Sequence, residues 1–362
     1  MMNKRSNRHE TNLMRQYMSK TAETVIIVIV IMGTILCCAV TVADAQTVRH
    51  VKVSGSASPS NSTSWENACS DLQAAIDASA PGDMVFVAEG TYIPIRPANN
   101  REIIDTNNRN NAFVLKEGVK VYGGFPADAN DAEHRSPESR KAEPDAQFTI
   151  LSGDLGIKNS YIDNAYHIVI GANIANGDNT ILDGFTLTGG NADFDGGFII
   201  VNESAVETNA GGGIFNVEAS PVFINIIIRD NLALQGGGIC NIDSNPCFSN
   251  LAVCNNTAFD GNGGGMYNSR SNPALCNSEL CDNKATNAGA IYNIFSSPKL
   301  KDVLVCKNRA NNVGGICNLN SSPSLVNVTT YENIASRNDG GLYNQNSLPK
   351  IENCYIYDRI IQ

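Results

Sequence analysis

The residues that could do chemistry in this sequence stand in columns, with one member in each unit of a repeat. One column alternates in charge and reads Asp230, Asn255, Asp282, Lys307, Glu332 and Asp358. Carboxylates beside a lysine could supply a general base and stabilise a developing charge. Mixed charge is also what a solvated surface normally carries. We therefore assign no catalytic residue and keep enzymatic activity at this column as the alternative.

A second column is aromatic and consists of Phe215, Tyr267, Tyr292 and Tyr343, interrupted by Cys240 and Cys317. Side chains alternate along a strand, so this column should point away from the apolar column beside it. An exposed stripe of aromatic rings would suit stacking on sugar rings. A stripe covered by a loop would only be packing. We favour packing, and keep glycan stacking as the functional hypothesis for these four aromatic residues.

The cysteines follow the repeat as well. Of the 11 cysteines, all but Cys37 and Cys38 come after residue 45, and Cys254, Cys281 and Cys306 share one column. This placement favours free thiols stacked as small apolar side chains. Adjacent repeats would lie about 4.8 Å apart, so a disulfide between them stays open. No CxxC pair with metal-site spacing is present, and we expect neither a metal nor a cofactor.

Other polar residues stand outside the columns. His134 and His167 have no partner in the repeat pattern. Asp154, Asp183 and Asp195 stand near turns, and we expect them to cap those turns because no spaced acidic Ca²⁺ loop surrounds them. We assign no site to these five residues.

The element that must position the columns is a phrase written six times between residues 211 and 357. It reads Gly-Gly-Gly-Ile-Phe-Asn at 211–216, and its six copies close on Asn216, Asn241, Asn268, Asn293, Asn318 and Asn344. Steps of 25 to 27 residues between these positions indicate stacked repeats. We expect the six asparagines to form a structural ladder along the axis, because unpaired polar groups would be buried at a cost.

The rest of each unit predicts the fold. Every unit carries a Pro, two further polar columns and three short apolar stretches. Gly, Pro and Asn at this density forbid helices, and helical repeats need longer units. Three strands and three corners in about 25 residues fit one turn of a coil. We predict an all-β chain, a right-handed parallel β-helix with three strands per coil and an N-terminal capping helix.

The N-terminal segment, residues 1–45, predicts export. An apolar run at Val25–Ala43 follows basic residues and precedes a small-x-small site. This layout is typical of a secretory signal peptide cleaved after Ala45, with a retained membrane anchor as the alternative. We expect a secreted protein, or one held at the cell envelope or outer membrane surface, with no transmembrane segment after cleavage.

Two further regions follow the signal peptide. We predict that residues 46–190 hold the cap and irregular first coils, and that residues 191–362 hold the regular coils. Ser64 is the expected N-cap of a helix that carries Trp65 on its buried face. Residues 126–147 should be a solvated insertion and residues 193–210 a surface loop.

Composition limits the class of partner. The chain of 362 residues has 26 Lys+Arg against 36 Asp+Glu, a formal net charge of −10. An acidic surface argues against nucleic acid and against anionic lipid as partners. We expect a monomer.

Specific motifs resemble a known family. The phrase Gly-Gly-(Gly/Ala)-(Ile/Met)-x-Asn alternates with Asn-x-Ala, and Val-Tyr-Gly-Gly-Phe (121–125) and Leu-Asp-Gly-Phe-Thr (182–186) precede it. With these motifs, nearly everything after residue 46 resembles the polymorphic outer membrane protein repeats and related bacterial right-handed parallel β-helix proteins.

The resemblance implies an exported, non-enzymatic β-helix that acts as a scaffold or adhesin. Its implied partners are host or environmental glycans or surface proteins. A polysaccharide-degrading (lyase or hydrolase) or glycan-binding β-helix protein is the alternative. Self-exporting family members carry a C-terminal barrel or another sorting domain, whereas this sequence stops at Gln362. We therefore expect either a fragment or another route of export.

Overall fold

The computed structural model describes residues 46–140, 148–158, 160–175 and 177–360. The predicted signal peptide and its cleavage site at Ala45 lie outside these residues. Thr47–Gln362 form one compact unit. In the described ranges, no helix is both long enough and apolar enough to cross a membrane.

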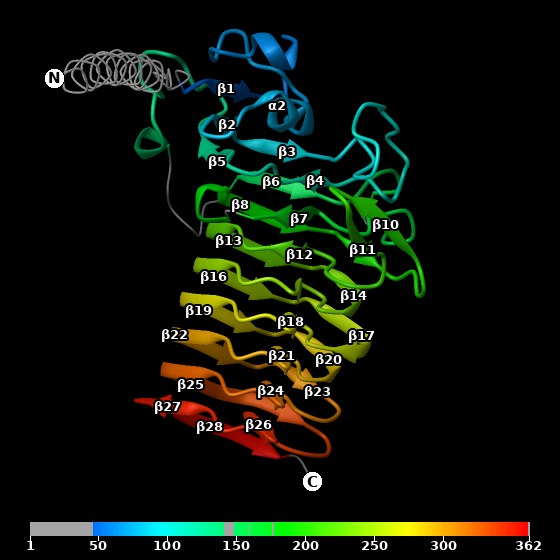
Figure 1. Cartoon of the computed structure of the whole chain (residues 1–362), viewed down its shortest axis with the longest axis vertical. Helices are drawn as coiled ribbons and strands as arrows, with labels where there is room; N and C mark the ends of the chain where they lie inside the picture. Colours follow the sequence, from blue (N-terminus) through cyan, green and yellow to red (C-terminus); the bar gives the residue numbers. More distant parts are fainter. Residues whose placement is uncertain (1–45, 141–147, 159, 176, 361–362) are drawn as a thin grey trace, which may run out of the picture. The chain divides into compact units, whose positions relative to one another are not determined.

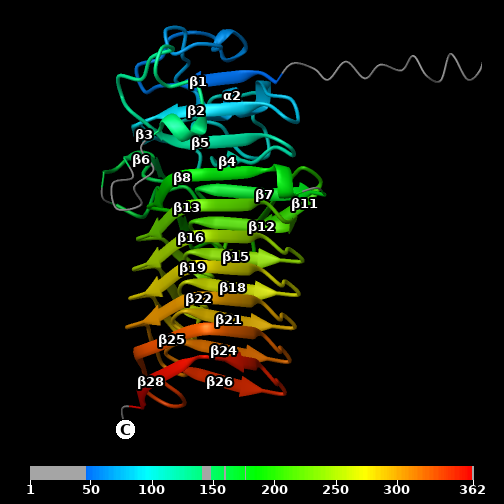
Figure 2. The same cartoon turned by 90° about the vertical axis from the view of Figure 1, so that its left-hand side faces the viewer.

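The repeated phrase winds into a coil of three strands. In one coil, β15 (Ile239–Ile242), β16 (Cys247–Cys254) and β17 (Thr257–Asn262) follow one another around the axis. Each strand pairs in parallel with the equivalent strand of the next coil. Figures 1 and 2 show the coils stacked with equivalent strands aligned. The chain is therefore a right-handed parallel β-helix with three strands per coil, as predicted.

The strands belong to two parallel sheets and one antiparallel hairpin. The larger sheet holds β1 (Val48–Val51), β2 (Met84–Ala88), β3 (Gly90–Tyr92), β5 (Lys120–Phe125), β6 (Thr149–Ser152), β8 (Ile181–Thr188), β9 (Asn191–Ala192), β13 (Val222–Arg229), β14 (Leu232–Gln235), β16, β17, β19 (Ala274–Cys281), β20 (Lys284–Asn287), β22 (Lys299–Cys306), β23 (Arg309–Ala310), β25 (Ser324–Ala335), β27 (Lys350–Glu352) and β28 (Tyr355–Ile360). The smaller sheet holds β4 (Phe113–Val114), β7 (Val169–Ile174), β12 (Ile214–Ala219), β15, β18 (Met266–Ser269), β21 (Ile291–Ile294), β24 (Ile316–Leu319) and β26 (Leu342–Gln345). The hairpin is β10 (Phe198–Val201) and β11 (Ser204–Glu207). Short 3₁₀ turns lie at Pro59–Asn61, Pro137–Ser139 and Gly177–Asn179.

Left-handed backbone makes the corners of each coil. Asn250 (φ 54°) bends β16 in mid-strand, and Asn255 (φ 56°) turns the chain just after β16 ends. Asn adopts this conformation more readily than residues with larger side chains. In the glycine phrase, Gly236 has φ 57°, and a Cβ at Gly237 would lie only 2.6 Å from the Thr257 carbonyl oxygen. The corner residues thus fix the outline of the coil.

The mid-strand bend regroups the predicted apolar stretches. Two of the three apolar stretches of each unit, which were predicted to form separate strands, lie on one strand: Phe223 and Ile228 are both in β13, on either side of Asn225. The third strand of that coil is instead β14. Asn225 has φ 53°, so one continuous strand turns a corner without leaving the sheet.

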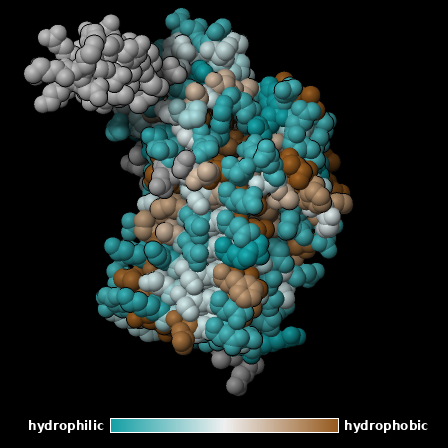
Figure 3. Space-filling view, in the orientation of Figure 1, coloured by the Kyte–Doolittle hydropathy of each residue, from teal (hydrophilic) through white to brown (hydrophobic). Residues whose placement is uncertain are grey.

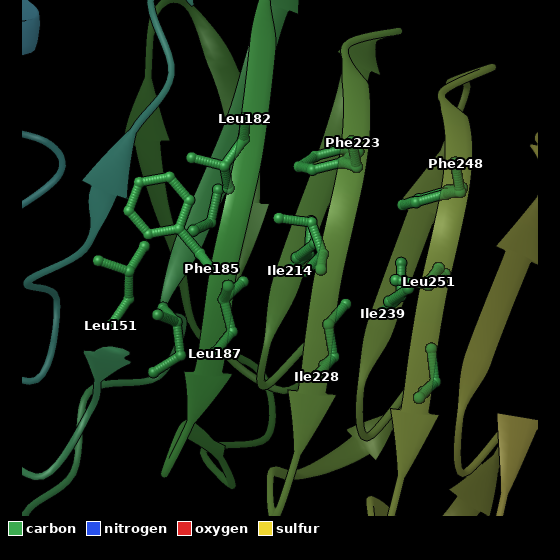
Figure 4. Packing of buried hydrophobic residues seen from close by; sticks show 14 of the residues in the cluster. Leu151, Leu182, Phe185, Leu187, Ile214, Phe223, Ile228, Ile239, Phe248 and Leu251 are labelled. Atoms are coloured by element: carbon green, nitrogen blue, oxygen red, sulfur yellow. The ribbon is translucent and has the colours of Figure 1, made fainter. Parts of the chain in front are cut away.

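The core is a stack of like residues from successive coils. Ile214 and Ile239 occupy equivalent positions, as do Phe223 and Phe248, and all four are fully buried. The two phenyl rings stack with centroids 5.1 Å apart and planes 12° from parallel. Figure 4 shows these columns of side chains running through the interior. Burying one such side chain contributes about 1.5–3 kcal/mol.

A short helix covers the free edge of the smaller sheet. Helix α2 (Leu72–Ala78) buries Leu72, Ala75 and Ile76 in the core, and the Gln73 side chain hydrogen-bonds to the backbone of Val114 in the edge strand β4. Its N-cap is Asp71, whose side chain accepts the backbone N–H of Ala74 at 2.9 Å. The predicted capping helix is therefore confirmed, but Ser64 is not its N-cap. The apolar face continues into the turns ahead of the helix, so helical spacing alone placed the start too early.

Trp65 lies in those turns and anchors the predicted insertion. It is buried in a small aromatic cluster with Phe86 and Phe125. Its backbone N–H donates to Asp131 at 2.9 Å, and its indole N–H donates to the carbonyl of His134 at 2.8 Å. The described part of the insertion is thus fastened to the cap rather than freely solvated.

Residues 193–210, expected to form a surface loop, contain the β10–β11 hairpin. Side chains alternate along it, with Ile199 and Val201 buried between exposed neighbours. Asn202 (φ 45°) and Glu203 (φ 71°) form its two-residue turn, for which such backbone angles suit strand twist. The predicted surface loop is therefore wrong, because buried and exposed residues alternate along Phe198–Val201 and Ser204–Glu207 as they do in paired strands.

Candidate functional site

A long groove follows the outer face of the larger sheet, where its strands bend. It has a volume of about 670 Å³ and passes over β13, β16, β19, β22 and β25. Four of the bend positions line it, and they are Asn250, Asn277, Asp302 and Asn327; Asn225 is the equivalent position in β13, and all five have φ between 48° and 55°. The sequence showed this polar column, but only the mid-strand bend reveals that it lines a concave surface. We call this surface the ladder groove.

Hydrogen bonds join part of this column along the axis. The side-chain amide of Asn250 donates to Oδ1 of Asn225 at 2.7 Å, and that of Asn225 donates to Asp183 at 2.8 Å. Further along, Asn327 donates to Asp302 at 2.7 Å. The ladder is interrupted at Asn277, whose exposed amide makes no hydrogen bond to the other described residues. Donor and acceptor capacity therefore remains free in the middle of the groove.

Arg140 closes one end of this column. It forms an ion pair with Asp183, and both side chains are largely buried. Arg140 Nη1 also donates to the backbone carbonyl of Asp183 at 3.2 Å, and the guanidinium lies 5.2 Å from the ring centroid of Tyr122. Asp183 was expected to cap a turn, and it instead begins the ladder beneath an arginine from the insertion.

The remaining wall of the groove mixes apolar and acidic side chains. Ile227, Ala252 and Leu304 are half-buried and supply apolar surface. Glu279 and Asp302 are exposed and supply carboxylates. Among the lining residues, which all belong to the described part of the chain, there is no Lys or Arg. The groove therefore offers amide and carboxylate hydrogen-bonding groups beside aliphatic patches, with a negative local charge.

The asparagine column of the repeated phrase lies inside the coil. Asn216 donates to Asn241 at 2.9 Å, and Asn241 to Asn268 at 2.8 Å. The later steps, to Asn293, Asn318 and Asn344, are each 2.8 Å. All but the last of these residues are buried, so the column holds the structure together and offers no binding surface.

The aromatic column divides into a covered and a partly open section. Phe215 and Cys240 are fully buried beneath Val201 and Val206 of the hairpin. Tyr267, Tyr292 and Tyr343 are half-buried.

The geometry of the open section weakens the glycan-stacking hypothesis. The rings of Tyr267 and Tyr292 stack 5.7 Å apart with planes 10° from parallel. The two rings therefore lie against each other from one coil to the next. Burial raises the pKa of Tyr292 to about 12, so this phenol is neutral at physiological pH. This arrangement favours packing between coils over stacking on a ligand.

The mixed-charge column proves to be a row of corners. From Asp230 to Glu332 its members have φ near 55–59°. Asp282, Lys307 and Glu332 line a second cavity of about 640 Å³ together with Tyr331. Asp358 is the exception, because its carboxylate accepts hydrogen bonds from Asn333. Asn333 is the last member of another buried asparagine column, which we call the inner column: Asn231, Asn256, Asn283, Asn308 and Asn333. The alternating charges thus arise where the backbone turns.

Metal and histidine chemistry find little support. Across the described ranges, no group of three or more His, Cys, Asp or Glu residues is placed to hold a metal ion. His167 is fully buried, and burial lowers its pKa to about 4 despite a contact of 3.0 Å from Nδ1 to the Gly211 carbonyl. His134 instead binds Trp65 through its backbone.

Another cavity lies beside the cap. It has a volume of about 710 Å³ and is bounded by the loop at residues 96–102 and the end of α2. Its arginines are engaged within the protein: Arg96 pairs with Asp71 at 2.7 Å, and Arg101 pairs with Asp77 at 3.1 Å. These two arginines are therefore already paired within the protein and do not stand ready for an anionic ligand. The sequence gave no sign of it, because a loop without periodicity forms its rim.

One pair of cysteines departs from the favoured prediction. Cys281 and Cys306 form a disulfide between adjacent coils, with Cα atoms 4.6 Å apart. Cys254, in the same column, is a free thiol. Free stacking was therefore wrong for two of these three cysteines, because in-register pairing brings equivalent Cα atoms within disulfide range.

The fold defines the class of protein: a parallel β-helix with a helical cap and an outer groove. No protein-family model matches the chain, and no curated protein matches it. Solved structures that are similar in fold include the following two. The first, a pectate lyase (Pel9A), is 14% identical with a TM-score of 0.41, covering 82% of this chain and 70% of that one. The second, the A-module of the Azotobacter vinelandii mannuronan C-5 epimerase AlgE4, is 13% identical with a TM-score of 0.29, covering 80% and 92%. At these identities the similarity concerns the fold alone.

Proposed function

We propose that this protein is an exported β-helix protein that binds an extended, uncharged glycan along the ladder groove without cleaving it. The observation that carries the proposal is the row of amide and carboxylate groups at the bend of the larger sheet. An adhesin that recognises a glycan needs such a site. Adhesion is the role that the resemblance of the repeats to outer membrane proteins implies.

The chemistry of the groove suits hydroxyl groups. Asn277 can both donate and accept hydrogen bonds, and Asp302 accepts them. Equivalent positions recur at about 4.8 Å along the axis, so a polymer lying in the groove meets a similar set of groups at each step. Ile227, Ala252 and Leu304 supply apolar contacts for the carbon face of a sugar ring.

A peptide or a polyanion fits the groove less well. A peptide that binds a sheet uses main-chain hydrogen bonds at a free edge. The groove lies on the face of strands that are already paired on both sides. A polyuronate would meet Glu279 and Asp302 without a compensating cation among the lining residues. An uncharged polysaccharide needs neither a free sheet edge nor a compensating cation.

Binding by the purified chain to a panel of neutral and acidic polysaccharides tests the proposal. The decisive variant is Asn277→Gly, which keeps the left-handed corner and removes the amide. Losing one or two hydrogen bonds should weaken binding about tenfold. Asn320→Gly is the matched control, because Asn320 is an exposed asparagine at another corner, with φ 49°. Equal affinity of the two variants would remove the groove as the binding site.

Two further measurements separate the alternatives. A lyase assay on acidic polysaccharides, read as ultraviolet absorbance of unsaturated product, should show no turnover. Steady turnover would replace the proposal by a β-helix enzyme. Tyr267→Ala and Tyr292→Ala should leave glycan affinity within about twofold, because these rings lie against each other. A large loss of affinity in the tyrosine variants would move the site to the aromatic column.

A further inference from the structure

Three cysteines stand in line on consecutive strands of the larger sheet. Cys254 ends β16, Cys281 ends β19 and Cys306 ends β22. The pairing register places Cys254 opposite Cys281, and Cys281 opposite Cys306. The disulfide joins the last two, and the Cys254 thiol lies on the other side of Cys281.

We propose that this column is a thiol–disulfide exchange site. The thiolate of Cys254 attacks Sγ of Cys281, a bond forms between these two sulfurs, and the Cys281–Cys306 bond breaks. The electron pair of the broken bond leaves on Cys306. The proton lost by Cys254 goes to solvent, and Cys306 takes a proton from solvent. One disulfide exists before and after the step, so neither an oxidant nor a reductant is consumed.

The stacking of the coils supplies the geometry for this step. Exchange proceeds by attack of a thiolate on a disulfide sulfur while the other sulfur leaves. Here the attacking, central and leaving residues occupy equivalent positions in three successive coils, so they follow one another along the axis. Neighbouring positions lie about 4.8 Å apart, within the Cα range of a disulfide, whereas Cys254 and Cys306 are about twice that distance apart. Cys281 must therefore be a partner in either disulfide.

The two ends of the column differ in charge. Burial raises the pKa of Cys254 to about 11, and Asp230, Glu279 and Asp282 contribute to the rise against a smaller opposing effect of Arg229. Beside Cys306, the chain continues to Lys307 and Arg309, which line the second cavity with Asp282 and Glu332.

Exchange would move the free thiol along the column. It would pass from Cys254, which is half-buried, to Cys306, which is 4% exposed and directly precedes Lys307 at the second cavity.

Alkylation of the folded full-length chain tests the proposal directly. The protein is incubated with iodoacetamide, quenched in acid and digested with trypsin without reduction. Cys306 is the only cysteine in the tryptic peptide Asp302–Lys307. Exchange predicts label on both Cys254 and Cys306 and none on Cys281. Label on Cys254 alone at all times would overturn the proposal.

The pH dependence adds a second readout. Cys306 should be labelled about tenfold faster for each unit of pH up to about 11, because the thiolate fraction of Cys254 rises in that proportion. A rate that does not change with pH between 7 and about 9 would contradict attack by Cys254.

Cysteine variants complete the test. In Cys306→Ser, a disulfide between Cys254 and Cys281 should form under the conditions that oxidise the parent chain. In Cys254→Ser, labelling of Cys306 should fall at least tenfold, while the Cys281–Cys306 disulfide persists. Far-ultraviolet circular dichroism confirms that each variant is folded. A folded Cys306→Ser chain in which Cys254 and Cys281 both remain free thiols would refute the exchange geometry.

Discussion

Asn333 donates two hydrogen bonds to one oxygen of Asp358. Its backbone N–H lies 2.8 Å from Oδ1 of Asp358, and its side-chain amide lies 2.9 Å from the same atom. Each earlier asparagine of this inner column, from Asn231 to Asn308, makes the same pair of bonds to the asparagine of the next coil. A carboxylate accepts but cannot donate onward, so Asp358 is a natural end for this column.

Replacing Asp358 by alanine should destabilise the last coil. The variant removes the acceptor of the Asn333 backbone N–H and of one of its two side-chain N–H groups, which costs about 2–3 kcal/mol; the other side-chain N–H still donates to the Val305 carbonyl. Hydrogen exchange of the β28 amides measures the loss locally. Asp358→Asn is the matched control and should lose less than about 1 kcal/mol, because the amide oxygen still accepts both bonds. Equal losses in the two variants would argue against the hydrogen bonds as the cause.

Asn283→Ala should be among the most damaging single substitutions. The Asn283 side chain is fully buried and donates to Asn308 and to the Val253 carbonyl at 3.0 and 2.9 Å. Its oxygen accepts two bonds from Asn256. We expect a loss of about 3–5 kcal/mol in the free energy of unfolding, measured by denaturant titration. Asn272→Ala, at an exposed asparagine, should lose under about 1 kcal/mol, and a similar cost there would contradict the importance of burial.

Phe295 offers a stabilising substitution. It is 61% exposed and has φ 50°, a left-handed conformation that is unfavourable for a bulky side chain. Phe295→Gly and Phe295→Asn should each raise the free energy of unfolding by about 1 kcal/mol. Phe295→Ala keeps the unfavourable backbone and serves as the control. If alanine stabilises as much as glycine, removal of the exposed ring explains the gain instead.

His167 should make stability fall in mild acid. Its pKa in the folded chain is about 4, below the ordinary value of 6.5, because it is buried. Between these two values the unfolded chain binds the proton more readily, so stability is present above pH 6.5 and is lost as the pH falls toward 4. The full loss is about 3 kcal/mol. Thermal unfolding measured from pH 7 to about 4 tests this, and His167→Asn should flatten the dependence. An unchanged slope in that variant would assign the effect to other groups.

The regular coils could be predicted because every column repeats. Ile214, Phe223 and Asn216 recur at equivalent places in later units, so one apolar or polar identity is sampled several times. This repetition allowed the strands to be predicted. The bend at Asn225 could not be predicted, because a polar residue between apolar ones also fits a loop between two strands.

Features outside the repetition were harder to predict. Ser64 looked like an N-cap because the apolar spacing ahead of the helix is helical, although Asp71 supplies the hydrogen bond. Asp358 was expected in the corner column of Glu332, but it pairs with Asn333, one residue further along. The reason is that the pairing register between β25 and β28 shifts after Tyr331. The ladder groove could not be predicted from any one repeat unit, because residues of several stacked coils form it.

The equal spacing of the coils has a consequence for how such a chain can change its length. The buried asparagine ladders and the core columns repeat once per coil, so a gene rearrangement that adds or removes a whole coil would keep equivalent residues paired at the junction. Strand pairing between Asn241 and Asn268 is chemically the same as that between Asn268 and Asn293. Recombination between repeats would therefore alter the reach of the protein in fixed increments while preserving its two ends.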